Sequence, residues 1–327
     1  MTFMMGAPNG RRMLQSATLL VAATLLGPVA NAQDQYPSNP VTIIVPFGPG
    51  GTSDIMARIL AKHLREQLNG NLIIDNKGGA GGAIGMSQLK RAKPDGYTLG
   101  LSVIGPEVLQ PGMRNTGYTY KDYDHICGTY SVPLMMMVTQ DSEFKSMQDV
   151  VAYAKKNPRQ LTYGTSGTGT LLHIAMETLM KEAGGTALHV PYKSSSEMVT
   201  GLMGKQVMVM SDTTTVAKQY KLRPIGIFSD ERLKTNPDVP TTKEAGWPLN
   251  ATIWGGLIAP KGLPENVVQK LQTACEKAVN SEGYKADVEP LDTPPHFMNA
   301  KDFAEFARSE SEKYTKVISE MGIRDEK

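Results

Sequence analysis

Two short loops rich in glycine and hydroxyl residues contain the residues best suited to binding chemistry. The first loop, residues 47–54, reads FGPGGTSD, and the second, residues 165–170, reads TSGTGT. Glycine lets the backbone approach a ligand closely, and serine and threonine hydroxyls add hydrogen-bond donors. Apolar residues with helical spacing follow each loop, so unpaired N–H groups and the positive end of a helix dipole would face it. These features favour a bound carboxylate, although each loop alone is also compatible with an ordinary tight turn.

The elements that must position these loops are strands before them and helices after them. Residues 41–45 (VTIIV) and 161–164 have the composition of buried strands. We expect Thr52 or Ser53 to cap the first helix and the second helix to cover 171–183. Two such units in different halves of the chain can hold one anion between two helix N-termini. Further strands are expected at 71–75, 97–103, 133–139, 187–192, 207–211, 223–229 and 252–259, and further helices at 83–91, 146–156, 264–279 and 301–321. This alternation predicts an α/β fold whose ligands bind beyond the carboxyl ends of the strands.

Other polar residues are candidates for the same site. His173 lies one turn into the second helix, where it can either donate to the ligand or pack within the protein. Asp212 follows a predicted strand and can either contact the ligand or cap neighbouring amides. Ser194 and Ser195 are expected to cap a helix first and to contact ligand second. Glu107 follows the end of another strand that faces the expected site, and we expect its side chain to point to solvent.

The N-terminus predicts export. Arg11 and Arg12 precede an apolar run at 17–26, and the sequence Ala-Asn-Ala ending at Ala32 suits a signal-peptide cleavage site. Cleavage there would leave 295 of the 327 residues and, since the signal carries two positive charges and no negative ones, a formal charge of zero. General secretion and twin-arginine export remain open. A neutral mature chain argues against binding to nucleic acid or to an anionic membrane surface, and no later segment has the length and apolarity of a membrane span.

The two cysteines and the absence of common catalytic motifs limit the remaining functions. Cys127 and Cys275 are 148 positions apart. Export would permit a disulfide between them, but each can equally be a small buried apolar residue. The sequence contains no nucleophile elbow, no phosphate-binding P-loop and no zinc-protease motif. A binding protein is therefore favoured over an enzyme, and no metal or organic cofactor is expected.

Several segments taken together resemble the periplasmic solute receptors of tripartite tricarboxylate transporters, known as Bug-type or TctC-like proteins. The matching segments are VPFGPGGTSD (45–54), NKGGAGG (76–82), KPDGYT (93–98), VPYK (190–193), VPT with EAG (239–241 and 244–246) and WGGL with AP (254–257 and 259–260). They cover nearly the whole mature chain in the expected order.

The resemblance implies a two-lobed periplasmic-binding-protein fold of the Venus flytrap type, each lobe a mostly parallel sheet flanked by helices, joined by two crossovers. Lobe I would comprise 35–132 and 252–327, and lobe II would comprise 133–251. A ligand carboxylate would lie between one loop from each lobe. The loop residues implied to bind it are Phe47, which would form an apolar wall, and Gly50, Gly51, Thr52, Ser53, Asp54, Ser166, Gly167, Thr168, Gly169 and Thr170.

The implied function is that of a monomeric periplasmic receptor. It would bind a dicarboxylate, a tricarboxylate, an acidic amino acid or an aromatic dicarboxylate, close around it, and deliver it to the large and small membrane subunits of a transporter. Nucleic acid is not an expected partner. Two alternatives stay open: a receptor that signals to a membrane sensor kinase, and a secreted hydrolase.

Overall fold

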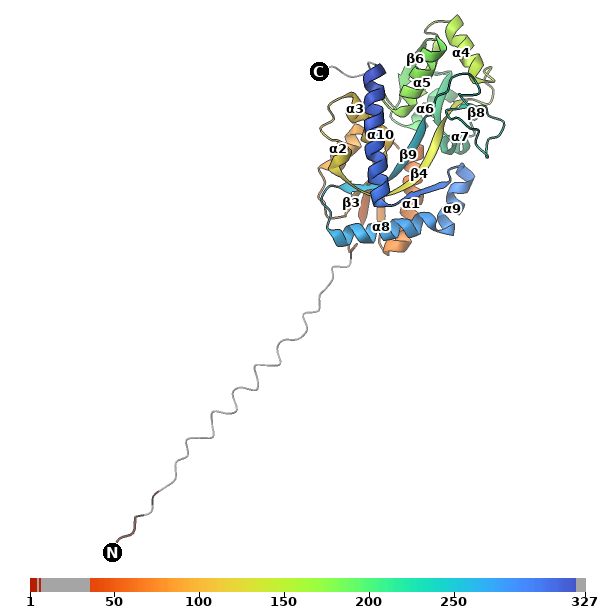
Figure 1. The fold of residues 1–327 in the computed structure, drawn as a ribbon. Helices are drawn as coiled ribbons and strands as arrows, with labels where there is room; N and C mark the ends of the chain where they lie inside the picture. Colours follow the sequence, from red (N-terminus) through yellow and green to blue (C-terminus); the bar gives the residue numbers. More distant parts are fainter. Residues whose placement is uncertain (5, 7–35, 322–327) are drawn as a thin grey trace. The chain divides into compact units, whose positions relative to one another are not determined.

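The computed structural model describes residues 1–4, 6 and 36–321. The predicted signal peptide lies outside the described residues except at 1–4 and 6. The chain divides into two units, Met1–Tyr36 and Pro37–Lys327, and the fold discussed below belongs to the second unit (Figure 1). Within the described residues no helix is long and apolar enough to cross a membrane.

The strands of the second unit form one continuous hydrogen-bonded sheet. The order of the strands along it is β2-β1-β3-β9-β4-β7-β5-β6, and β10 and β8 pair with β4 beside this path. Pairing is parallel at the outer strands, between β1 and its neighbours β2 and β3 and between β5 and its neighbours β6 and β7, and antiparallel around β4 and β9. The strands are β1 (Val41–Val45), β2 (Leu72–Asn76), β3 (Thr98–Val103), β4 (Tyr123–Val138), β5 (Leu161–Thr165), β6 (Ala187–Pro191), β7 (Val209–Thr213), β8 (Arg223–Ile227), β9 (Thr252–Pro260) and β10 (Pro295–Met298).

Helices cover both halves of this sheet (Figure 1). We call β1, β2, β3, β9, β10 and the start of β4 the first half, and the end of β4 with β5, β6, β7 and β8 the second half. In the first half, α1 packs on α8 and α10 packs on β4, and in the second half α6 packs on β5 and β7. The helices are α1 (Thr52–Leu68), α2 (Ala83–Lys90), α3 (Gln110–Met113), α4 (Met147–Lys156), α5 (Leu171–Ala183), α6 (Ser195–Met203), α7 (Thr214–Tyr220), α8 (Glu265–Asn280), α9 (Glu282–Val288) and α10 (Ala300–Met321).

The long strand β4 connects the two halves. It pairs with β9 from Tyr123 to Pro133 and with β7 from Leu134 to Met137. The prediction that this strand begins only at residue 133 is wrong, because its first ten residues already belong to the sheet. Register shifts between β4 and β9 interrupt the alternation of inward and outward side chains there, so the sequence pattern of a strand is weak in this part.

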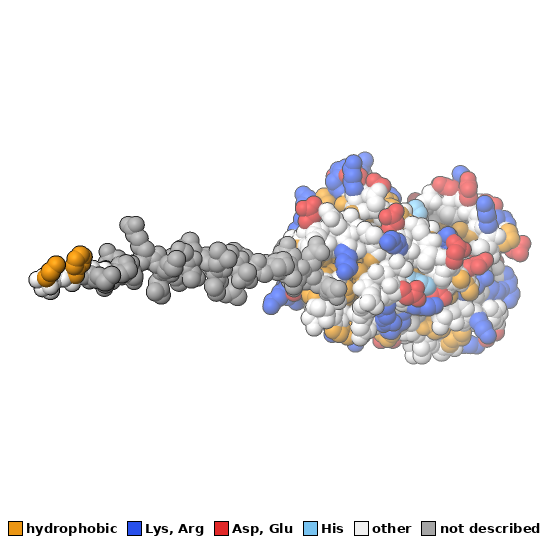
Figure 2. All heavy atoms as spheres, turned by 90° about the horizontal axis from the view of Figure 1, so that it is seen from below, with side chains coloured by type: hydrophobic (Ala, Val, Ile, Leu, Met, Phe, Trp, Pro, Cys, Tyr) orange, Lys and Arg blue, Asp and Glu red, His pale blue; other side chains and the backbone are white. Residues whose placement is uncertain are grey.

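The surface of the second unit carries charges of both signs. On the face shown in Figure 2, Lys and Arg side chains are interspersed with Asp and Glu side chains. Many of them form exposed ion pairs, such as Arg232 with Glu244 and Arg308 with Glu305. Interspersed charge agrees with the small formal net charge of the sequence.

A disulfide links the sheet to a covering helix. Cys127 on β4 bonds to Cys275 on α8, and the side chains of both residues are fully buried. Of the two possibilities left open by the sequence, the structure therefore has the disulfide. It ties residues far apart in the chain across the core of the first half.

Replacing both cysteines with serine is expected to lower the free energy of unfolding by about 2–5 kcal/mol, because the unfolded chain loses a long covalent loop constraint. Denaturant unfolding of the oxidised wild type and the Cys127→Ser/Cys275→Ser variant measures this difference. Reduced wild type serves as the control and should approach the stability of the variant. Equal stability of oxidised wild type and variant would contradict the prediction.

Candidate functional site

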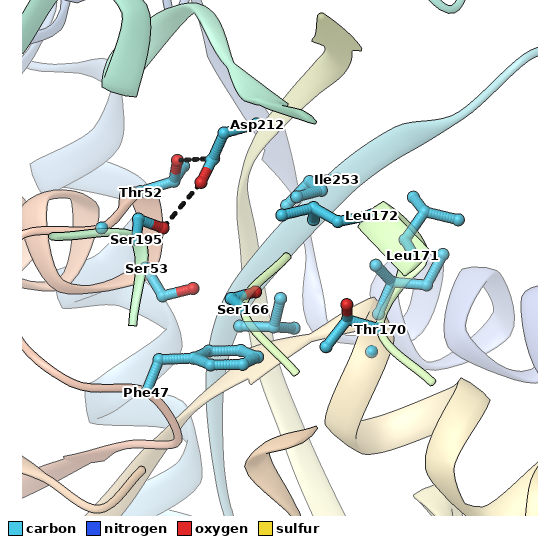
Figure 3. Close-up of a pocket in the computed structure, with 14 residues that line it drawn as sticks. Phe47, Thr52, Ser53, Ser166, Thr170, Leu171, Leu172, Ser195, Asp212 and Ile253 are labelled. Atoms are coloured by element: carbon cyan, nitrogen blue, oxygen red, sulfur yellow. Dashed lines mark hydrogen bonds between the residues drawn. The ribbon is translucent and has the colours of Figure 1, made fainter. Parts of the chain in front are cut away.

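A pocket lies where loops from the two halves of the sheet meet (Figure 3). Together with the adjoining space that is open to solvent, its empty volume is about 420 Å³. The loops that form it follow the carboxyl ends of β1, β3 and β5, as expected for an α/β sheet. The residues that line the pocket are Phe47, Gly51, Thr52, Ser53, Val103, Ile104, Gly105, Ser166, Thr170, Leu171, Leu172, Ser195, Asp212 and Ile253.

The N-terminus of α1 faces this pocket without a side-chain cap. Its N-cap residue is Gly51, which has no side chain to accept a hydrogen bond from the first turn. The prediction that Thr52 or Ser53 caps this helix is therefore wrong. The Thr52 hydroxyl instead contacts Asp212 at 3.2 Å and Thr213 at 2.7 Å, on the other half of the sheet. Because the first N–H groups of a helix have no intrahelical acceptor, this N-terminus offers donors to a ligand.

The N-terminus of α5 faces the same pocket and also lacks a side-chain cap. Its N-cap residue is Thr170, whose hydroxyl donates to the carbonyl of Gly167 at 2.8 Å instead of accepting from the helix. By contrast, α4 and α6 begin after Ser146 and Ser194, whose hydroxyls do accept from the first turn of their helices. Three helices have first residues in the lining: α6 has a side-chain cap, whereas α1 and α5 lack one and leave their terminal donors available.

Asp212 is the carboxylate in the pocket wall, and it is buried. Three donors surround it: the Ser195 hydroxyl at 2.6 Å, the Thr213 N–H at 2.8 Å and the Thr52 hydroxyl at 3.2 Å. The two hydroxyl bonds are dashed in Figure 3. Burial raises the pKa of Asp212 to about 6, although these hydrogen bonds act to lower it. Asp212 lies on β7, and its carboxylate thus joins the starts of α1 and α6 to this strand.

Asp54 is oriented away from the pocket lining and supports the loop from behind. Its carboxylate accepts from the Gly50 N–H at 2.9 Å, from the Asn76 amide at 2.9 Å and from the Arg58 guanidinium at 3.0 Å. Burial acts to raise the pKa of Asp54, but these three donors outweigh it and the pKa is lowered. Gly50 has φ +83°, and its carbonyl accepts from the Tyr220 hydroxyl at 2.9 Å. Both residues therefore fix the path of the loop.

His173 is packed behind the second loop. Its Nδ1 accepts the N–H of Gly169 at 3.1 Å, and its ring stacks on His189 with the centroids 4.0 Å apart. Burial lowers the pKa of His173 and, together with His173, lowers the pKa of His189 to about 4. His189 Nε2 contacts the Thr165 hydroxyl at 2.6 Å, and that hydroxyl donates to the Gly167 carbonyl. Two neutral rings therefore position the loop.

The remaining glycines and threonine of the second loop lie beside the pocket. Gly167 and Thr168 line a neighbouring pocket, and the Thr168 carbonyl accepts from the Gln110 amide at 3.0 Å. The structure therefore brings seven of the predicted residues together in the lining: Phe47, Gly51, Thr52, Ser53, Ser166, Thr170 and Asp212. It locates the other six outside the lining: Gly50, Asp54, Gly167, Thr168, Gly169 and His173.

Apart from Phe47, which was predicted as an apolar wall, the apolar side chains of the lining are absent from the predicted set. It consists of Val103, Ile104, Leu171, Leu172 and Ile253. The position of Ile104 directly after a predicted strand was an available signal, because the carboxyl ends of strands form the site. The other four side chains have the spacing of ordinary core residues, and their sequence pattern does not distinguish a pocket wall from a core.

Glu107 is buried, so the prediction that it points to solvent is wrong. The residue is 1% exposed and lies on a π-helical turn, η2 (Gly105–Leu109). One carboxylate oxygen contacts His125 Nε2 at 2.6 Å, and the other accepts from the Ser102 hydroxyl. These partners on β4 and β3 satisfy the carboxylate and fix the turn behind Ile104. Among the described residues, no group of three or more His, Cys, Asp or Glu side chains is arranged to hold a metal ion.

This chain is similar to known proteins in sequence and in fold. A family model described as "Tripartite tricarboxylate transporter family receptor" matches residues 56–323. The "UPF0065 protein in gbd 5'region" of Cupriavidus necator is 34% identical over 321 residues, covering 96% of this chain and 98% of that protein.

Two solved structures are similar over nearly their whole length. The "periplasmic binding protein BugD" has a TM-score of 0.84 and 30% identity, covering 88% of this chain and 99% of that chain. "R. palustris Rpa4515 with adipate" has a TM-score of 0.82 and 28% identity, covering 88% of this chain and 98% of that chain.

The buried carboxyl of Asp212 is expected to make stability depend on pH. Its folded pKa of about 6 lies above its usual value of 3.8, so the protonated form is favoured on folding. The resulting stability is fully present below the unfolded pKa and is lost as the pH rises through about 6. From about pH 4 to about pH 7, the free energy of unfolding of wild type should fall by roughly 2–3 kcal/mol relative to Asp212→Asn.

Denaturant unfolding of both proteins across this pH range provides the measurement. Asn keeps the size of Asp and one acceptor oxygen, so the comparison isolates the ionisation. The exposed Asp238→Asn variant is the matched control for loss of one carboxyl group. Parallel stability curves for wild type and Asp212→Asn would show that Asp212 ionises in the folded protein as readily as in the unfolded chain.

Proposed function

The chain belongs to the tripartite tricarboxylate transporter receptor family and is a solute receptor, and we propose that its pocket binds one carboxylate group of a small organic acid. The observation that carries this proposal is the pair of uncapped helix N-termini, those of α1 and α5, which open onto one pocket. Anions are the ligands that such donors stabilise most.

The charge of the lining supports the same proposal. In the part of the chain that the structure describes, no Lys, Arg or Glu lines the pocket, and Asp212 already accepts from three donors of the protein. Repulsion between Asp212 and a bound anion is reduced further by the pKa of about 6, because part of the population is neutral near that pH. Phe47 and the apolar side chains would contact the carbon skeleton of the acid.

A further part of the proposal concerns closure and delivery. We infer that 35–132 with 252–327 and 133–251 are two lobes that close on the ligand, which would shift the population toward the closed form. The Ser196 hydroxyl, which donates to the Pro49 carbonyl at 2.8 Å, and the Thr52–Asp212 bond are contacts that closure would make. The monomeric receptor, exported by cleavage near Ala32, would then deliver its ligand to the membrane subunits of a transporter without chemical conversion.

A thermal-shift screen over an organic-acid panel tests the proposed function, because a ligand that binds only the folded state raises the melting temperature. The panel should include adipate, since a 28% identical relative was solved with it, together with tricarboxylates, acidic amino acids and aromatic dicarboxylates. Neutral esters and amides of the same acids are the controls. Stoichiometric binding without turnover supports a receptor, whereas conversion of any acid would identify an enzyme.

Replacing Ser166 with alanine is expected to weaken binding of the best acid about tenfold, or about 1.4 kcal/mol, since one donor to an anion is lost. Ser166 lines the pocket, and its hydroxyl has no hydrogen-bond partner among the described residues. Calorimetry on Ser166→Ala and on Ser309→Ala, an exposed serine of α10 whose hydroxyl donates only within its helix, makes the comparison. Equal affinities of both variants would remove Ser166 from the site.

A further inference from the structure

A second pocket adjoins the first and shares Ser166 with it. Together with the adjoining space that is open to solvent, its empty volume is about 650 Å³. The first half of the sheet contributes the loop after β2 and Arg114 after α3, and the second half contributes the second glycine loop, the end of β6 and the residues that follow it. The lining residues are Gly79, Ala80, Gly81, Arg114, Ser166, Gly167, Thr168, Pro191, Tyr192 and Lys193. Since Ser166 belongs to both linings, the two pockets adjoin at this residue.

The charge of this second pocket differs from that of the first. It contains two cationic side chains, Arg114 and Lys193, and no acidic one. Neither cation has a carboxylate within ion-pair distance among the described residues, and this contrasts with Lys62 and Lys261, which pair with Asp287 and Asp124. The pocket therefore presents positive charge that the protein itself does not neutralise.

Arg114 is held in place by neutral acceptors. Its Nη2 donates to the Ala80 carbonyl at 2.7 Å and to the side-chain oxygen of Gln110. A guanidinium has five N–H donors, so Nε and Nη1 remain for a further acceptor. Gln110 also donates to the Thr168 carbonyl, which links Arg114 to the second glycine loop. Residues of both halves of the sheet thus orient the Arg114 side chain, and its positive charge stays available to a ligand.

Lys193 approaches from the other half of the sheet. It follows β6, and its backbone N–H donates to the Glu197 carboxylate at 3.1 Å, an interaction that fixes the backbone at the start of α6. The side chain is exposed and has no partner among the described residues. Tyr192 beside it is half-buried and offers an apolar ring to the chain of a ligand.

We propose that Arg114 and Lys193 bind a second carboxylate of the ligand, so that the solute is a dicarboxylate spanning both pockets. This inference rests on the proposed function, in which the first pocket holds the first carboxylate. Helix N-termini and hydroxyls select and orient that first group, whereas the two cations select for a second negative charge. Arginine suits this role because its planar donors match a carboxylate in two-point geometry.

The test compares diacids with partners that differ by one charge. Succinate, glutarate, adipate and suberate are each paired with the monomethyl ester, which keeps the length and one carboxylate. Calorimetry on the wild-type protein should show the best diacid binding at least tenfold more tightly than its monoester. Equal affinities for the two members of every pair would overturn the second carboxylate site while leaving the receptor proposal intact.

Variants then assign the effect to the two cations. Lys193→Gln and Arg114→Gln are each expected to weaken the best diacid about tenfold and to leave its monoester unchanged, and Lys193→Arg should retain the affinity. Lys156→Gln, on the exposed face of α4, is the matched control. Diacid affinities in Lys193→Gln and Arg114→Gln equal to wild type would overturn the inference. Failure of every diacid and monoester to bind wild type would instead refute the carboxylate pocket itself, and the inference with it.

Discussion

The buried carboxyl of Asp212 is the interaction on which the geometry of the site depends. It accepts from Thr52 at the start of α1, from Ser195 at the start of α6 and from the N–H of Thr213 at the end of β7. A buried carboxyl without such donors would be strongly destabilising, so all three segments must stay in place together. Because Thr52 and Ser195 come from different halves of the sheet, this side chain, together with the Ser196–Pro49 and Tyr220–Gly50 hydrogen bonds, sets how closely the loops around the pocket approach each other. The position of the α1 N-terminus follows from it.

The two uncapped helices connect this geometry to binding. The N-cap residues Gly51 and Thr170 provide no side-chain cap, so the first N–H groups of α1 and α5 need another acceptor. Water can accept from these N–H groups in an open pocket, whereas a ligand must accept from them in a closed one. A carboxylate bound as we propose would do this for both helices at once and would act as the missing cap. Supporting contacts lie one layer behind, where Asp54 holds the first loop and His173 holds the second. Several predicted site residues therefore position the loops and do not line the pocket.

Local patterns in the sequence were sufficient for the elements and for the loops, but the partners of polar side chains were not predictable from them. The strand Val41–Val45 and the helix Leu171–Ala183 have the predicted bounds, since apolar periodicity and flanking glycines are local properties. By contrast, the expected cap of α1 by Thr52 or Ser53 does not form, and Thr52 contacts Asp212, 160 positions away. Glu107 was expected in solvent, but His125 and Ser102 on neighbouring strands make its burial possible. The partners of these two side chains depend on which strands become neighbours in the sheet, and the spacing of residues along the chain does not directly predict which strands these are.

The distribution of charge between the two pockets has a physical reason. A lysine or arginine in the first pocket, which we call the inner pocket, would be a buried, unpaired charge whenever the receptor is empty, and burying such a charge is costly. Helix N-termini and hydroxyls carry no net charge, so the empty inner pocket is tolerable, and they still stabilise an anion once water is excluded. Lys193 is exposed and Arg114 is half-buried, so both stay partly hydrated without a ligand. The second pocket is therefore where a formal positive charge can contribute to selectivity for a ligand without destabilising the unliganded protein.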